Sequence, residues 1–170
     1  RDAWASLPAP IRARHIADGE ARLGHDWPTV LATRFLDYVR DGDRDLMQRL
    51  SFGRRSALLS LVLAECTEGD GRFIDDIVNG VWAICEETYW GVSAHIGVQK
   101  AGPGLPDVSE PTVDLFAAET AALLAWTQYL LADELAVVSP LVPARVATEI
   151  DRRVLTSLLE RDDYGWMGFR

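Results

Sequence analysis

Segment 73–90 carries the residues of this chain best suited to chemistry. Its apolar residues recur at steps of three and four, which predicts a helix with one buried face. The opposite face combines aromatic, amide and acidic side chains: Asn79, Trp82, Glu86 and Trp90, flanked by Glu87 and Tyr89. Solvent-exposed helix faces rarely carry tryptophan. An aromatic ring can stack on the apolar face of a sugar while amides and carboxylates bind its hydroxyls. The pattern therefore predicts either a carbohydrate site or a helix buried on both sides.

A histidine follows this face in the chain. His95 lies in the loop after Trp90, and an imidazole near acidic and aromatic groups suits general acid–base catalysis because its unperturbed pKa is ~6.5. The alternative is a loop histidine that binds a backbone carbonyl. His15 and His25 have less support. The three histidines do not have a metal-binding spacing, and no Gly-rich phosphate loop is present, so we expect neither a metal nor a cofactor.

Glu119 is an isolated acid in an otherwise apolar segment. It is the only charged residue between Asp114 and Asp133, and a helix that is apolar nearly all round is normally buried. A buried carboxylate has to be hydrogen-bonded, paired with a cation or protonated. We expect Glu119 either to anchor the loop at 91–111 or to face a pocket as an acid, and the structural role is favoured.

The composition limits the class of protein. The chain has 170 residues, of which 48% are hydrophobic, and a formal net charge of −9. These values predict one folded domain and argue against disorder, nucleic-acid binding and attachment to an anionic membrane. Cys66 and Cys85 are too few for a disulfide framework or a zinc site, so we expect buried thiols. The pairs Arg54-Arg55 and Arg152-Arg153 favour bridges between helices, with recognition of an acidic sugar as the alternative.

Helical periodicity runs through the chain with almost no alternation typical of strands. We expect helices at 10–23, 28–41, 43–65, 73–90, 112–134 and 142–160, with Thr112 as the cap of the fifth. Short connections predict antiparallel helical hairpins in an all-α fold. The exception is 91–111, which is rich in glycine and proline, and irregular loops of more than ~12–15 residues are usually functional or disordered.

Several runs in this sequence resemble the heparinase II/III-like family. They are 66–77, 79–90, 94–95 and 113–121, and the likeness extends over about 27–170. The resemblance implies an (α/α) toroid in which helical hairpins surround a sugar-binding cleft. Members typically cleave uronic-acid polysaccharides by β-elimination, and a β-sandwich domain follows the toroid. We therefore expect 1–170 to be a single helical domain that forms about half of a toroid, its amino-terminal part, with some catalytic groups outside it.

The chemistry of elimination assigns provisional roles to the residues above. The reaction needs a group that neutralises the uronate carboxylate, a base for the C5 proton and an acid for the leaving oxygen. Asn79 and a protonated Glu86 suit the first role, and His95 or Tyr89 suits the second or third. The expected substrate is an acidic polysaccharide or oligosaccharide, with further contacts from Trp82, Trp90, Glu87 and Glu119.

Two other classes of function fit the same residues. A glycoside hydrolase on this fold would use a pair of carboxylates, Glu86 or Glu87 with Glu119. A non-catalytic module for carbohydrate or protein binding would present Trp82 and Trp90 on an open surface. An open stack of hairpins also predicts self-association through an apolar edge near 146–159. The sequence contains no recognisable signal segment and leaves the compartment open.

Overall fold

The computed structural model describes residues 2–167, and their regular structure is entirely helical. This confirms the predicted all-α fold. The α-helices are α1 (Asp2–Ala5), α2 (Ala9–Glu20), α3 (Ala32–Asp41), α4 (Asp45–Glu68), α5 (Ile74–Cys85), α6 (Leu115–Leu130), α7 (Ala132–Val138), α8 (Leu141–Ile150) and α9 (Thr156–Glu160). Two short 3₁₀ helices, η1 (Ser93–Val98) and η3 (Gly165–Met167), and one π-helical turn, η2 (Asp151–Leu155), complete the set.

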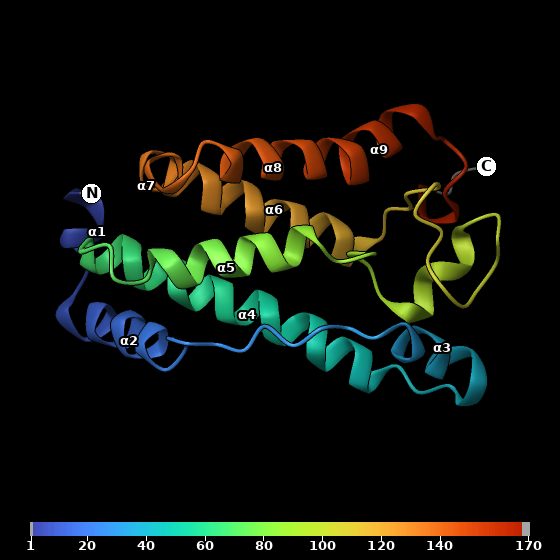
Figure 1. Ribbon diagram of the computed structural model, residues 1–170, viewed down its shortest axis with the longest axis horizontal. Coiled ribbons are helices and arrows are strands. Elements are labelled where there is room, and N and C mark those ends of the chain that lie inside the picture. The colour runs from blue at the N-terminus through green and yellow to red at the C-terminus, as the bar shows by residue number, and fades with distance from the viewer. Residues whose placement is uncertain (1, 168–170) are drawn as a thin grey trace.

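The long helices form a stack of antiparallel hairpins (Figure 1). The chain reverses between α4 and α5, which pack together, and again between α6 and α8. Helix α2 covers one side of α4, while α8 packs against both α5 and α6. The core lies between these layers and includes Leu58, Leu61, Ile77, Val81 and Leu124, all of them fully buried. The hairpins predicted from the short connections are therefore present.

The helix predicted at 28–41 begins four residues later than expected, at Ala32. Trp27 adopts a left-handed backbone conformation with φ of 50°, and the residue before a proline is disfavoured in the helical region. Its indole lies against Gly80 of α5, where a Cβ would overlap the ring. Packing between distant segments thus decides the conformation of this stretch.

The predicted helix 73–90 was wrong in its last turn, because α5 ends at Cys85. Beyond that point the chain turns back on the helix: the indole Nε1–H of Trp90 donates to the carbonyl of Ile84 at 2.9 Å. Glu87 is drawn toward α4 by two arginines. The periodicity had predicted that Trp90 and Glu87 lie on or beside the same helix face as Trp82. They do not, because both residues follow the end of α5.

The predicted helix 112–134 is shorter and broken. Asp114, not Thr112, is its N-cap, since the Asp114 carboxylate accepts from the backbone N–H of Ala117 at 2.8 Å. At Leu131 the chain bends, so that α6 and α7 meet at 85°. Among the described helices, none is by itself long and apolar enough to cross a membrane. Only α6 and α7 taken together reach the necessary length and apolar composition, and they are bent relative to each other.

The predicted helix 142–160 is confirmed as a nearly continuous path through α8, the π turn and α9. Its buried side carries Val146 and Val154, whereas Leu155 and Leu159 are exposed. The segment 91–111 is irregular apart from η1, as expected. Both segments contribute residues to the groove and to the small cavity described next.

Candidate functional site

His95 and Asp114 form a hydrogen-bonded pair at the junction of η1 and α6. His95 Nδ1 lies 2.7 Å from Oδ2 of Asp114. The same carboxylate oxygen accepts from the backbone N–H of Val92 at 3.1 Å, and Oδ1 is the cap acceptor for Ala117. Asp114 is only 6% exposed, so its position is well defined by these contacts. Local chain geometry thus brings a loop histidine to the start of a helix.

The network determines which nitrogen of His95 carries the proton. An ionised carboxylate can only accept hydrogen bonds, so Nδ1 must be the donor toward Asp114. In the neutral ring the other nitrogen, Nε2, then has a free lone pair. The hydrogen bonds found within 2–167 include none at Nε2, and the His95 side chain is 42% exposed. This arrangement suits a general base.

His95 and Asp114 line a groove of about 710 Å³, here called the histidine groove. Its walls come from η1, the first turns of α6, Leu158 of α9 and Trp166, and are mostly apolar. Trp166 is 56% exposed; its Nε1–H donates to the carbonyl of Val113 at 2.9 Å, and its ring stacks on Tyr164. A volume of this order is typical of small-molecule sites. The groove therefore places an open indole close to a polarised imidazole.

The Tyr89 hydroxyl and the Asp114 carboxylate both lie next to Gly91. A Cβ at Gly91 would overlap the Tyr89 hydroxyl oxygen and come within 2.7 Å of Asp114 Oδ1. The Tyr89 hydroxyl accepts from Thr112 Oγ1 at 3.4 Å. Burial, and secondly the Asp114 charge, raises the pKa of the Tyr89 phenol well above its ordinary value. Tyr89 is thus a protonated group near neutral pH, which is unsuited to act as a base.

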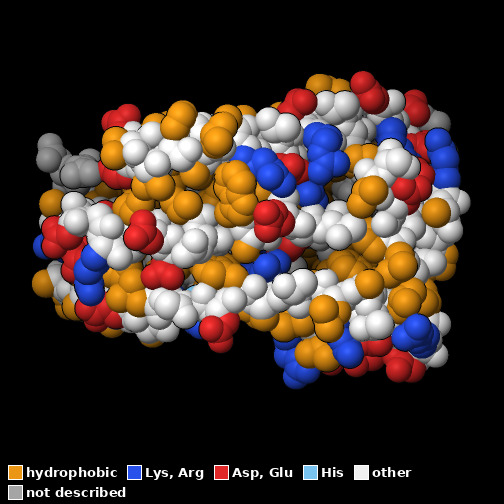
Figure 2. All heavy atoms as spheres, viewed as in Figure 1, with side chains coloured by type: hydrophobic (Ala, Val, Ile, Leu, Met, Phe, Trp, Pro, Cys, Tyr) orange, Lys and Arg blue, Asp and Glu red, His pale blue; other side chains and the backbone are white. Residues whose placement is uncertain are grey.

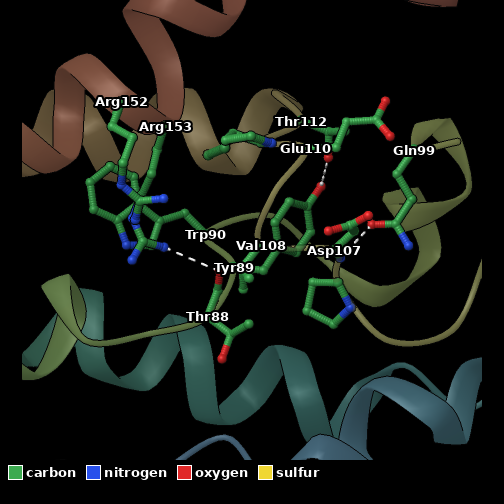
Figure 3. Close-up of a pocket in the computed structure, with 13 residues that line it drawn as sticks. Thr88, Tyr89, Trp90, Gln99, Asp107, Val108, Glu110, Thr112, Arg152 and Arg153 are labelled. Atoms are coloured by element: carbon green, nitrogen blue, oxygen red, sulfur yellow. Dashed lines mark hydrogen bonds between the residues drawn. The ribbon is translucent and has the colours of Figure 1, made fainter. Parts of the chain in front are cut away.

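A small cavity adjoins Tyr89 and Trp90 (Figure 3). Its volume is about 20 Å³, which is room for a single water and far too little for a sugar ring. Trp90 is 2% exposed, and the Arg153 guanidinium lies over its ring at 4.8 Å. In Figure 3 Arg153 also reaches the carbonyl of Thr88, at 3.3 Å. The indole predicted to be a stacking platform is therefore enclosed.

Trp82 also faces a guanidinium. It is partly buried, and Arg145 lies 5.4 Å above its ring. Glu149 ties Arg145 to Arg152 and Arg153, with N–O distances of 2.9, 2.7 and 2.6 Å. Figure 2 shows basic side chains gathered on this face, where α8 continues toward α9. The predicted sharing of one hollow by Trp82 and Trp90 was wrong, because cations of α8 and η2 cover both rings.

Glu87 is part of a buried ion cluster. Its carboxylate binds Arg54 at 2.7 Å and Arg55 through two nitrogens at 2.7 and 3.0 Å. Arg55 continues to the Thr120 hydroxyl of α6 at 2.8 Å. The cluster joins α4 to α6 and to the link after α5, as the bridging interpretation of the Arg54-Arg55 pair predicted. Both oxygens of Glu87 are thus already engaged by the protein.

The remaining predicted residues lie apart from the histidine groove. Asn79 and Glu86 are exposed and do not line it. Glu119 is exposed as well, so its predicted burial was wrong. The physical reason is that α6 is covered on one side only, and its open side carries apolar residues beside Glu119: Leu115, Trp126 and Tyr129. Composition therefore suggested more burial than packing provides.

Sequence reasoning did not assign two residues of the groove. Asp114 falls inside the helix predicted at 112–134, for which Thr112 was taken as the cap, although an Asp just before an apolar helix is itself a cap signal. Trp166 lies in the aromatic, glycine-rich stretch near the carboxy terminus, which carried no assigned role. Within 2–167, no three His, Cys, Asp or Glu side chains are placed to hold a metal ion.

Fold and site together define an all-α protein with a histidine–aspartate pair beside an apolar groove. A scan against protein-family models matches no family, and a search of the curated proteins finds no match. The resemblance to the heparinase II/III-like family thus depends on the sequence runs alone.

Proposed function

We propose that the histidine groove is the acid–base site of a carbohydrate-active enzyme that cleaves uronic-acid polysaccharides by β-elimination. The observation that supports this most directly is the 2.7 Å contact between His95 Nδ1 and Asp114, which leaves Nε2 free in the groove lining. The class of reaction comes from the family resemblance, and the role of the histidine comes from its tautomer. A helical toroid that includes these hairpins is part of the same proposal.

In the proposed step, His95 Nε2 takes the proton from C5 of the uronate. The electron pair of that C–H bond becomes the C4–C5 double bond, and the C4–O bond to the next sugar breaks. The leaving oxygen takes up a proton, which the imidazolium can supply, so that atoms and charge balance. Asp114 stabilises the imidazolium while the proton is held there.

Trp166 is the proposed stacking platform. Its indole is open to the groove, unlike those of Trp82 and Trp90, and its Nε1–H is fixed on the Val113 carbonyl. The groove lining within 2–167 contains no Lys, Arg, Asn or Gln. We therefore propose that the group which neutralises the uronate carboxylate comes from outside this lining, consistent with a catalytic set that is shared between parts of a toroid.

Glycoside hydrolysis is less well supported. It requires two carboxylates flanking the bond to be cleaved. Asp114 is the one acid in the described groove lining, and three donors occupy its oxygens. Of the acids considered for hydrolysis, Glu87 is held by arginines and Glu119 lies on the exposed side of α6.

The test is substitution of the pair, with elimination followed by the ultraviolet absorbance of the unsaturated uronate product on a panel of uronate polysaccharides. We expect His95→Gln to lower kcat by at least about a hundredfold, the usual contribution of a general acid or base. Asp114→Asn keeps a good helix cap but loses the acceptor charge, so its pH–rate profile should change as well. His15→Gln on α2 is the matched control. An activity of His95→Gln within about twofold of wild type would refute the assignment.

A further inference from the structure

The aromatic stretch after α9 returns to the residues that lead into α6 (Figure 1). Tyr164 is only 3% exposed, and its hydroxyl oxygen accepts from the backbone N–H of Val113 at 3.2 Å. The carbonyl of Val113 accepts from Trp166 Nε1–H at 2.9 Å. Both polar backbone groups of Val113 are therefore bound by side chains of one carboxy-terminal segment, and Val113 directly precedes Asp114.

A hydroxyl of α9 extends this network. Ser157 Oγ lies 2.6 Å from the Tyr164 hydroxyl oxygen and donates to the carbonyl of Pro111 at 2.7 Å. Each hydroxyl has a single hydrogen to donate. Because the hydrogen of Ser157 is used on Pro111, the hydrogen between the two hydroxyls is the one of Tyr164. The hydrogen bonds thus run from the Val113 N–H through both hydroxyls to the Pro111 carbonyl.

The ring of Tyr164 is held independently of its hydroxyl. The Arg161 guanidinium lies 4.5 Å from the ring centroid, and the Trp166 indole stacks on the ring with centroids 5.3 Å apart. Arg161 is in turn bound by Glu110 at 2.9 Å. Removal of the hydroxyl alone would keep these ring contacts and abolish the hydrogen bonds to the segment before α6. Tyr164→Phe is therefore a specific probe of the hydroxyl.

The network ends beside the acid–base pair of the histidine groove. The peptide plane that joins Val113 to Asp114 is rigid, so a fixed Val113 also fixes where Asp114 begins. The Asp114 carboxylate in turn accepts from the N–H of Val92 and binds Nδ1 of His95. Tyr164 is not among the residues that line the groove. Its influence on the groove therefore passes through Val113 and Asp114.

We propose that Tyr164 is a positioning residue for the His95–Asp114 pair, because its hydroxyl holds the backbone from which the Asp114 carboxylate reaches Nδ1 of His95. A role in catalysis rests on the function proposed above, whereas the orientation of the imidazole is a property of the fold alone. An imidazole bound by one carboxylate keeps a single neutral tautomer, with its hydrogen on Nδ1. Without the Tyr164 hydroxyl we expect this contact to loosen and the two neutral tautomers to mix.

The first experiment determines the tautomer of His95 by NMR of the ¹⁵N-labelled chain at about pH 8, where a free imidazole is neutral. In the wild type we expect well-separated resonances for a protonated Nδ1 and an unprotonated Nε2, and in Tyr164→Phe these two resonances should move toward each other. His95→Gln identifies the signals among those of the three histidines, and Tyr129→Phe, at an exposed position of α6, is the matched control. His95 resonances that coincide in wild type and folded Tyr164→Phe would overturn the proposal.

The second experiment separates this inference from the proposed elimination reaction. Tyr164→Phe should lower kcat about tenfold, which is less than the loss expected for His95→Gln, and leave KM unchanged because Tyr164 does not line the groove. A mixed tautomer with unchanged kcat, or a wild type without elimination activity, would refute the role of His95 in elimination and leave the positioning role supported by the NMR comparison.

A second variant covers the case in which Tyr164→Phe does not fold. Ser157→Ala removes the hydroxyl that accepts from Tyr164 and keeps the Tyr164 side chain itself. We expect the His95 resonances to move in the same direction as in Tyr164→Phe, by a smaller amount. Resonances identical to those of the wild type in Ser157→Ala would then overturn the proposal.

Discussion

Gly91 is the residue on which the geometry of the His95–Asp114 pair depends most directly. We expect Gly91→Ala to destabilise the chain by about 1–3 kcal/mol, because the added Cβ would overlap the Tyr89 hydroxyl and crowd the Asp114 carboxylate. Thermal or urea unfolding measures this loss. Gly97→Ala is the matched control, since a Cβ there meets open space and φ is not in the left-handed region. Equal stability of the two variants would contradict the packing described here.

The two thiols should be chemically quiet in the folded protein. Burial raises the pKa of Cys85 to about 11 and that of Cys66 to about 11, with the Glu65 charge a second cause at Cys66. The thiolate is the reactive form, and a raised pKa lowers its fraction at pH 8. We expect slow alkylation by iodoacetamide in buffer and rapid alkylation of both in urea. Rapid labelling of native Cys85, which is fully buried, would contradict this.

At the residue scale, residue type predicted which side chains could do chemistry better than it predicted where they lie. His95 was identified from its loop and its neighbours, and it does line a groove. Asn79 and Glu86 were placed near it by helical spacing, and Glu119 was expected to be buried, but all three are exposed and none of them lines that groove. Spacing along one helix cannot reveal which partner helix covers a face, and that partner determines burial.

Glu149 connects two elements of the fold. It binds three arginines, two of which also donate to the carbonyl of Cys85 at the end of α5. We expect Glu149→Gln to lower the free energy of unfolding at pH 7 by about 1–3 kcal/mol, because the arginines lose their shared acceptor. Urea unfolding measures this, and Glu119→Gln, at an exposed site, should change little.

The pH dependence of stability tests the same cluster. Burial alone would raise the pKa of Glu149, but hydrogen bonds from Arg153 and Arg152 outweigh it, so that its pKa lies below the ordinary value of 4.5. The contribution of Glu149 to the free energy of unfolding is therefore fully present above its pKa in the unfolded chain. This contribution is lost as the pH falls through the lower pKa of the folded protein. Between about pH 5 and 3 wild type should lose more stability than Glu149→Gln. Parallel curves would contradict the pairing.

At the element scale, helix identity was predictable and helix ends were less so. The apolar steps of three and four located each long helix correctly. Contacts in the structure explain three of the misplaced ends: Trp27 packs on Gly80, Trp90 turns back to Ile84, and Asp114 takes the cap position that was assigned to Thr112. The first contact joins distant segments, and the other two are local side-chain hydrogen bonds that apolar periodicity does not include.

The exposed edge of the final helices predicts association between copies of the whole molecule. Leu155 is 49% exposed and Leu159 is 87% exposed, within the segment where an apolar edge was expected. We expect light scattering to show a mass that rises with protein concentration, and Leu159→Asp to suppress the rise because a buried charge opposes contact. Val137→Asp, an equally polar change on α7, is the control. A concentration-independent monomer would refute this prediction.

The sequence by itself determined the all-α class, the hairpin succession and the identity of the chemically capable side chains. Periodicity and loop length are local properties, and local properties suffice for these features. Tertiary structure alone decided that Asp114 orients His95, that arginines cover Trp82 and Trp90, and that Tyr164 reaches the backbone of Val113. Those juxtapositions join residues far apart in the chain, and only the packing of one helix on another specifies them.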